Sequence, residues 1–286
     1  MKLGIKEKYA YILPAQIAIA LFAITPILFL LYIGSQKFAI GFPWRTRKFV
    51  GLKNFVDIFQ DGRFWNSIGL TFIFVIAVTV LSLIVGLAIA LIVHREFKFK
   101  AIVISSMLIP SIIPPSILGL LWKLMYSKEY GVINYFLSPF GISPNWLGPN
   151  LAFIAVVITS VWLASSFMSL VSLAGLESIP PEFYEAAAID GAGPVQAFFG
   201  ITLPMLKPVL GIAVMLQQVG VLHIFGIVYI LTRGGPGDRT NVLALFVYRT
   251  GRDTGYMGLG AAMAVVLAVI ALFMSLALIK YLGEEL

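Results

Sequence analysis

The sequence predicts an all-α membrane protein with six transmembrane helices and one polar, helical loop between the fourth and the fifth. Hydrophobic residues make up 60% of the 286 residues and charged residues only 12%, and the mean hydropathy is +0.97. A soluble domain carries roughly a quarter charged residues. The chain also contains long runs without Asp, Glu, Lys or Arg, each near the roughly 20 residues that a membrane-crossing helix needs. A water-soluble enzyme and a disordered protein are therefore excluded.

Six apolar runs define the predicted spans, all within a single membrane domain of residues 1–286. We expect the first run to be an uncleaved helix, because its apolar stretch reaches Gly34 and is too long for a signal peptide. Pro110, Pro114 and Pro115 should kink the third span. Gly and Pro are frequent in residues 130–150, which indicates a loop before the fourth. The spans are expected at about 10–34, 67–93, 101–125, 151–176, 208–231 and 256–280.

The charged residues exclude some partners but do not orient the chain. The net charge of +7 comes from basic residues scattered through an apolar chain, so we expect no nucleic-acid partner. The absence of Cys and the presence of only two His residues argue against a metal site. An even number of spans places both termini on one side. With termini inside, only eight of the 20 basic residues lie inside, so the positive-inside rule argues weakly for the opposite orientation.

The loop at 177–207 predicts two short helices joined by a turn. Pro181 suits a helix N-terminus, and Glu182 and Glu185 suit the positive end of the helix dipole. Three consecutive alanines follow, and Gly191 allows a left-handed stop. The loop also contains several Phe residues, and apolar side chains on a polar loop indicate a partner surface.

A spaced pattern in this loop resembles that of a known family. Glu185-Ala186-Ala187, Gly191, Ile201, Leu203 and Pro204 match the signature loop of permease subunits of binding-protein-dependent ABC importers. The neighbouring Ile179-Pro180-Pro181 and Asp190 resemble the carbohydrate-uptake class. The resemblance implies that the loop lies in the cytoplasm, that both termini do too, and that the protein resides in the cell membrane. It implies ATPase-coupling roles for Glu185, Ala186, Ala187, Asp190, Gly191, Ile201, Leu203 and Pro204, with a break in the helix at Leu203-Pro204.

The resemblance also implies partners. These are a second six-span permease subunit, two nucleotide-binding ATPase subunits, an extracytoplasmic solute-binding protein and the lipid bilayer. The chain has no GxxxxGK[ST] motif, so we expect a non-catalytic subunit without cofactors, with ATP and magnesium bound by the ATPase. The expected cargo is a sugar or related polyol. The alternative is a secondary transporter or channel driven by an ion gradient, which predicts charged residues within the spans; the sequence has none in mid-span.

Polar and aromatic side chains in two spans could contact the substrate. On a continuous fifth helix Gln218, Leu222, Phe225 and Tyr229 form one stripe, beside Gln217. In the fourth span Trp162, Ser166 and Ser169 share a face. Helix packing is the alternative for all of these residues, and it is favoured for the serines, which let helices approach closely. His223, about 140° from Gln218 on the helix, fits packing or gating better than a ligand.

Overall fold

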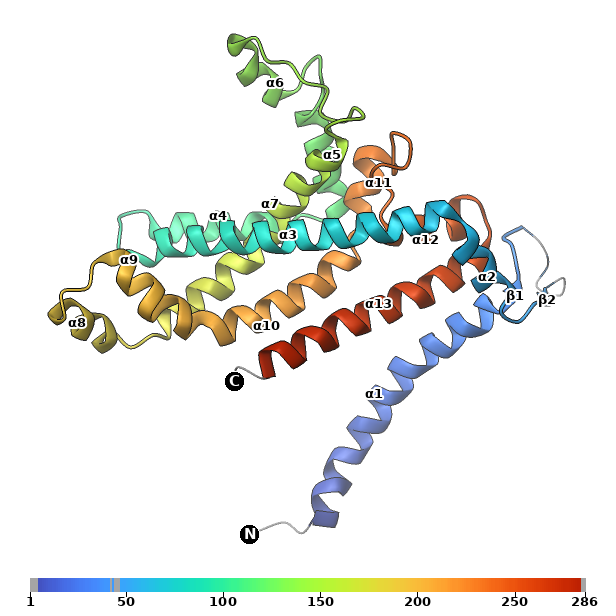
Figure 1. Cartoon of the computed structure of the whole chain (residues 1–286), viewed down its shortest axis with the longest axis horizontal. Helices are drawn as coiled ribbons and strands as arrows, with labels where there is room; N and C mark the ends of the chain where they lie inside the picture. The colour runs from blue at the N-terminus through green and yellow to red at the C-terminus, as the bar shows by residue number, and fades with distance from the viewer. Residues whose placement is uncertain (1–4, 42, 44–46, 284–286) are drawn as a thin grey trace. The chain divides into compact units, whose positions relative to one another are not determined.

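The computed structural model describes residues 5–41, 43 and 47–283, and these form helices almost throughout (Figure 1). The elements are α1 (Ile5–Gly34), β1 (Gln36–Lys37), β2 (Lys48–Phe49), α2 (Lys53–Gln60), α3 (Gly62–His94), α4 (Lys100–Ile112), α5 (Pro115–Met125), α6 (Val132–Leu137), η2 (Ser138–Phe140), α7 (Ala152–Glu177), α8 (Glu182–Ile189), α9 (Pro194–Ala197), η3 (Phe198–Thr202), α10 (Leu203–Leu222), α11 (Gly226–Thr232), α12 (Leu243–Tyr248), η4 (Arg249–Asp253) and α13 (Met257–Gly283). Two compact units result, residues 1–65 with 246–270 and residues 66–245 with 271–286, and each is described by itself.

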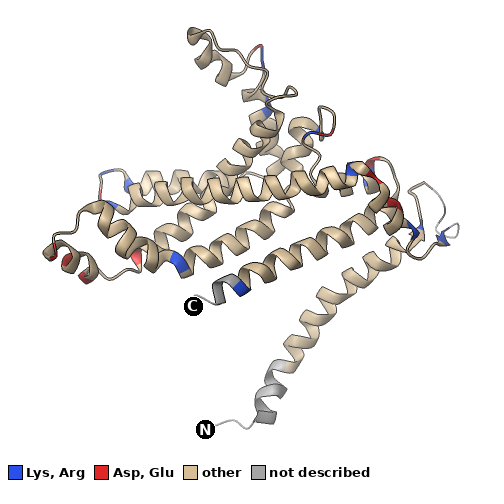
Figure 2. Cartoon of the chain, in the orientation of Figure 1, with Lys and Arg blue, Asp and Glu red and all other residues tan. Residues whose placement is uncertain are grey.

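The membrane-crossing helices confirm the predicted fold class. Within the described residues, five helices are long and apolar enough to cross a bilayer, and counting a sharply bent pair of helices as one span makes six. Lys, Arg, Asp and Glu collect at helix ends and connecting segments, while the middles of the long helices carry almost none (Figure 2). The chain is therefore a multi-pass membrane protein. The termini themselves, residues 1–4 and 284–286, lie outside the described residues.

The fifth span differs from the predicted 208–231. Its helix runs from Pro194 through η3 and α10 to Leu222, so Leu203-Pro204 is not the break that was predicted. Pro204 directly follows the π-helical turn of η3, in which the N–H of Leu203 donates to the carbonyl oxygen of Phe198, so its missing N–H falls where the bonding pattern changes. The helix ends where Nδ1–H of His223 donates to the carbonyl oxygen of Val219 at 2.8 Å.

The third span is broken rather than kinked. α4 and α5 meet at 103° around Ile113 and Pro114. Ile113 is extended, with φ −76° and ψ 125°, because the ring of a following proline disfavours the helical conformation. Pro110, by contrast, lies inside α4 without ending it.

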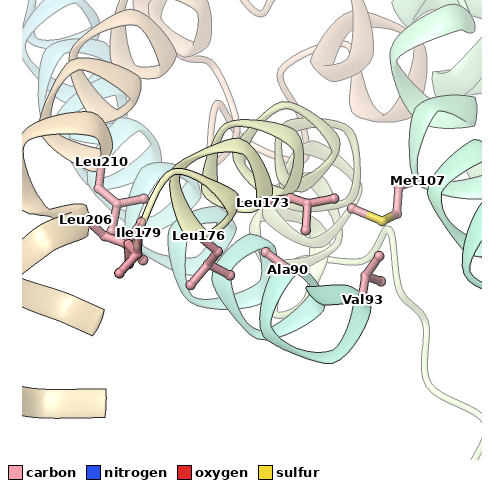
Figure 3. Close-up of a cluster of buried hydrophobic side chains, with 8 residues drawn as sticks. All are labelled: Ala90, Val93, Met107, Leu173, Leu176, Ile179, Leu206 and Leu210. Atoms are coloured by element: carbon pink, nitrogen blue, oxygen red, sulfur yellow. The ribbon is translucent and has the colours of Figure 1, made fainter. Parts of the chain in front are cut away.

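α7 is the central helix of the unit formed by 66–245 and 271–286. It is the most buried of the long helices in the described chain, and α4, α10 and α11 pack on it. A buried cluster near its C-terminal end joins it to its neighbours and is made of Ala90, Val93, Met107, Leu173, Leu176, Ile179, Leu206 and Leu210 (Figure 3). At Gly86 of α3 the helices meet so closely that a Cβ would lie 2.5 Å from that of Met168. Small residues allow this approach, as in other membrane bundles.

The other unit contains a short connection between α1 and α3. β1 pairs antiparallel with β2, placing Gln36 opposite Phe49. The amide of Asn54 in α2 donates to the carbonyl oxygens of Gly34 and Gln36, at 2.8 and 2.9 Å, and so ties α2 to the end of α1.

Candidate functional site

The loop between α7 and α10 forms a hairpin of α8 and α9, and we call residues 178–202 the coupling hairpin. α8 ends in a left-handed turn at Gly191, whose φ is +79°. The N–H of Gly191 donates to the oxygen of Ala188 at 3.1 Å, and that of Ala192 donates to Ala187 at 2.9 Å. This bond pair is the Schellman motif, which requires a left-handed residue at the position of Gly191. The predicted glycine stop is confirmed in its geometry.

The coupling hairpin is seated on the bundle by specific contacts. The hydroxyl groups of Tyr184 in α8 and Thr202 in η3 lie 2.9 Å apart and share a hydrogen bond. Ile179, at the start of the hairpin, is 8% exposed and belongs to the buried cluster of Figure 3, against which Tyr184 and Leu203 also pack. The coupling hairpin is thus packed against residues of α3, α4, α7 and α10.

The outward surface of the coupling hairpin combines acidic and apolar side chains. Acidic residues gather on α8 (Figure 2), and none of them forms an ion pair with a described residue. Ile189 is 87% exposed, and Phe183, Val195 and Phe199 are also exposed. Of the predicted coupling residues, Glu185, Ala186, Asp190, Gly191 and Pro204 are exposed, whereas Ala187, Ile201 and Leu203 are half-buried. Such a surface indicates a protein partner.

A second candidate region lies where two helices break. α5 packs on α11, and a Cβ at Gly119 would lie 3.1 Å from the Cβ of Ile230. Between the α4–α5 and α10–α11 breaks is a cavity of about 410 Å³. Its lining is Ser111, Leu163, Ala164, Phe167, Leu216, Gln217, Gly220, Val221 and Ile224. Irregular backbone at membrane depth is tolerated where it lines such a cavity, and transporters commonly bind substrate at discontinuous helices.

The predicted pathway residues do not all meet at this cavity. Gln217 lines it, and Trp162, half-exposed, precedes the lining residue Leu163 while its ring contacts that of Trp122 at 5.9 Å. Gln218 is buried, and its Nε2 has no hydrogen-bond partner among the described residues. Because α10 ends at Leu222, the predicted continuous stripe from Gln218 to Tyr229 is wrong.

The remaining predicted pathway residues lie elsewhere. Phe225 and Tyr229 lie beyond the helix break, and Tyr229 faces the guanidinium of Arg233, 5.8 Å from its ring centre. The hydroxyl of Ser166 donates to the carbonyl oxygen of Met107 and accepts from Ser111 at 2.7 Å. This bond pattern joins α7 to α4, as helix packing requires.

Sequence reasoning missed two polar groups. Ser111 lines the cavity. Its position, a polar residue one turn before Pro114, was the sequence signal that could have identified it. The bond between Tyr184 and Thr202 joins residues 18 apart, and no local pattern predicts it.

Residues 82–282 match the family model described as "Binding-protein-dependent transport system inner membrane component". This match includes the coupling hairpin and both helix breaks. The chain belongs to this family. It is thus the transmembrane permease subunit of an ABC importer. The family match favours this function over a transporter or channel driven by an ion gradient.

Similar proteins agree with this assignment. The permease is 38% identical over 277 residues to the trehalose/maltose transport system permease protein MalF of Thermococcus litoralis, covering 96% of this chain and 93% of that protein. It is 35% identical to the sulfoquinovosyl glycerol transport system permease protein SmoG of Agrobacterium fabrum, covering 91% and 84%. A solved chain of a bacterial ABC transporter that imports the acidic polysaccharide alginate shares the fold, with a TM-score of 0.80, 24% identity and coverage of 96% and 94%.

Proposed function

We propose that this permease, acting as one membrane domain, forms with a second six-span permease the pathway for a sugar or related polyol. Two ATPase subunits, which bind ATP and magnesium, dock on the coupling hairpin from the cytoplasm. A solute-binding protein delivers the substrate on the opposite side. The termini of the chain are cytoplasmic in this arrangement, and the protein resides in the cell membrane.

The seat of the coupling hairpin carries the proposal. A surface that only binds a partner needs no rigid connection, whereas one that transmits force does. Here the bond from Tyr184 to Thr202 and the buried side chain of Ile179 fix α8 to the bundle, and the Schellman turn at Gly191 holds the end of α8 in shape. ATPase closure would therefore shift α7 and α10 together with the hairpin. Both helices line the 410 Å³ cavity, so the movement would reach it.

The topology of α7 supports the positions of the partners. α6 precedes this span and α8 follows it, so the two lie on opposite sides of the membrane. With α8 in the cytoplasm, α6 faces the side of the solute-binding protein. A second solved structure of the alginate transporter contains a periplasmic protein with bound alginate pentasaccharide, and its chain has a TM-score of 0.78 to this one.

The named relatives and the cavity support the substrate class. The two relatives described above carry trehalose/maltose or sulfoquinovosyl glycerol in their names. The amide of Gln217 and the hydroxyl of Ser111 could exchange hydrogen bonds with sugar hydroxyls, while Phe167 and the aliphatic lining contact the C–H faces.

Charge reversal at Glu185 tests the coupling role. In the assembled transporter, Glu185→Lys should abolish the stimulation of ATPase activity by loaded binding protein and lower uptake, without loss of the subunit from the membrane. The control is Glu129→Lys, which reverses an exposed charge in the segment before α6, on the opposite side of the membrane. This variant should transport normally. Normal uptake by Glu185→Lys would contradict the proposal.

The two glutamines test the pathway. Gln217→Ala should raise the substrate concentration needed for half-maximal uptake and leave basal ATPase activity unchanged, because its amide lines the cavity. Gln218→Ala is the matched control, because Gln218 is the adjacent buried residue and does not line the cavity. Equal uptake kinetics in wild type and Gln217→Ala would remove this residue from the pathway.

A further inference from the structure

A second cavity lies behind the coupling hairpin, away from the helix breaks. It has a volume of about 450 Å³ and is formed by the end of α3, the end of α7 and the inner side of the hairpin. Its lining is Leu91, His94, Arg95, Leu176, Tyr184, Pro194, Ala197, Phe198 and Thr202. Since the spans α3 and α7 end at His94 and Glu177, the cavity lies where hydrocarbon gives way to the polar membrane surface.

The lining separates apolar from cationic chemistry. Leu91, Leu176, Ala197 and Phe198 make most of the wall apolar, while the basic side chain of Arg95 lies at the end of α3. These apolar walls would leave most hydroxyl groups of a free sugar without hydrogen bonds, and an inorganic anion would gain nothing from them. A ligand that combines an anionic group with an aliphatic chain fits both parts.

The charge balance around Arg95 favours an anion. In the same turn, Glu96 is neutralised by Lys100, with Nζ 2.9 Å from Oε1. No described carboxylate lies within ion-pair distance of Arg95, and none of the acidic residues of the coupling hairpin lines the cavity. Arg95 and Lys98 thus leave the turn between α3 and α4 with excess positive charge, and Figure 2 shows its basic residues.

We propose that this cavity binds an anionic phospholipid of the cytoplasmic leaflet, with the phosphate at Arg95 and the upper acyl chain along Leu91, Leu176 and Phe198. Basic pockets between membrane helices on the cytoplasmic side bind such headgroups. The lipid contacts both α3 and the pair Tyr184 and Thr202, so it braces the coupling hairpin against the bundle. The leaflet and the effect on coupling rest on the proposed function, whereas binding does not.

Lipid binding is tested first, in the assembled transporter in nanodiscs containing a photoactivatable phosphatidylglycerol. Peptides from 84–95 and 194–203 should be labelled. Arg95→Gln should lower this labelling about fivefold, which is the change in affinity expected when one basic residue near a membrane surface is lost. Lys98→Gln, a neighbouring charge that does not line the cavity, is the matched control and should keep the labelling. Equal labelling of wild type and Arg95→Gln would overturn the proposal. Loss of labelling on addition of inorganic phosphate would also overturn it, since the site would then bind a soluble anion.

Coupling is tested separately, by comparing nanodiscs of phosphatidylcholine alone with nanodiscs that also contain phosphatidylglycerol. Wild type and Lys98→Gln should show several-fold greater stimulation of ATPase activity by loaded binding protein with the anionic lipid, and Arg95→Gln should not. A lipid response retained in Arg95→Gln would overturn the bracing role. Labelling that depends on Arg95 in a transporter that couples in neither lipid would uphold the site while contradicting the proposed function.

Discussion

The left-handed turn at Gly191 makes the most specific prediction about the coupling hairpin. The substitution Gly191→Ala adds a single Cβ atom at φ +79°. Nothing lies within 4 Å of that atom, so the change removes no contact and creates no clash. The only cost is the conformation itself, because an L-residue places its Cβ too close to the following carbonyl oxygen there.

The expected cost is about 1–2 kcal/mol. The two bonds of the Schellman turn, from Gly191 to Ala188 and from Ala192 to Ala187, resist relaxation to another conformation. Local opening of the end of α8 should therefore become more frequent by a factor of about 5–30. Gly191→Asn should lie between glycine and alanine, since Asn enters the left-handed region more easily.

Hydrogen exchange of peptides covering α8 and α9, measured by mass spectrometry on the assembled transporter, reports this opening. Exchange at 188–193 should accelerate in Gly191→Ala, and less substrate should be imported per ATP hydrolysed. Gly200→Ala is the matched control, because it adds the same atom in the same hairpin at ordinary φ with nothing within 4 Å. Equal exchange in the two alanine variants would refute the reasoning.

Three further predictions concern other parts of the chain. Gly86→Ala should lower the melting temperature of the purified subunit markedly, since its Cβ would meet backbone of α7 at 2.9 Å, whereas Gly69→Ala in the same helix meets nothing and should not. Asn134→Ala should destabilise the segment 128–146 by about 2 kcal/mol, seen as faster proteolysis there, because a buried amide with three hydrogen bonds is lost. The Arg63 guanidinium holds the pKa of Asp61 below its usual range. The carboxylate thus stabilises the start of α3 above pH 4 and loses this effect as the pH falls through its lowered pKa. When thermal stability is measured against pH, the free energy of unfolding should fall by about 0.5 kcal/mol over this range, and the fall should be absent in Asp61→Asn.

The spans were predictable because each apolar run is a local property, and so was the glycine stop at Gly191. The fifth span was misplaced because Lys207 ends the charge-free run at its start, and because Leu203-Pro204 suggests a break from sequence alone. In the structure the π-helical turn of η3 precedes Pro204 and lets the helix continue. The helix ends at Leu222, where the ring of His223 donates to the carbonyl oxygen of Val219, a contact that no propensity indicates.

The residues that line the cavity could not be predicted from the sequence either. Gln217 and Gln218 are adjacent in sequence and both are buried, and only the position of α10 against α4 and α7 places Gln217 in the cavity lining and leaves Gln218 outside it. Ser166 looked like a substrate contact or a packing residue, and its bond to Ser111, 55 residues away, shows what holds it.

The sequence by itself determined that this chain resides in a bilayer and that an acidic, alanine-rich hairpin with a helix-ending glycine follows the fourth span. Composition and helix-ending preferences act on neighbouring residues, so they can be read in order along the chain. Only the tertiary structure decided where the third and fifth spans break, which polar groups share a cavity, and how the coupling hairpin is seated. Those features depend on contacts between helices far apart in the sequence, where packing overrides local preference.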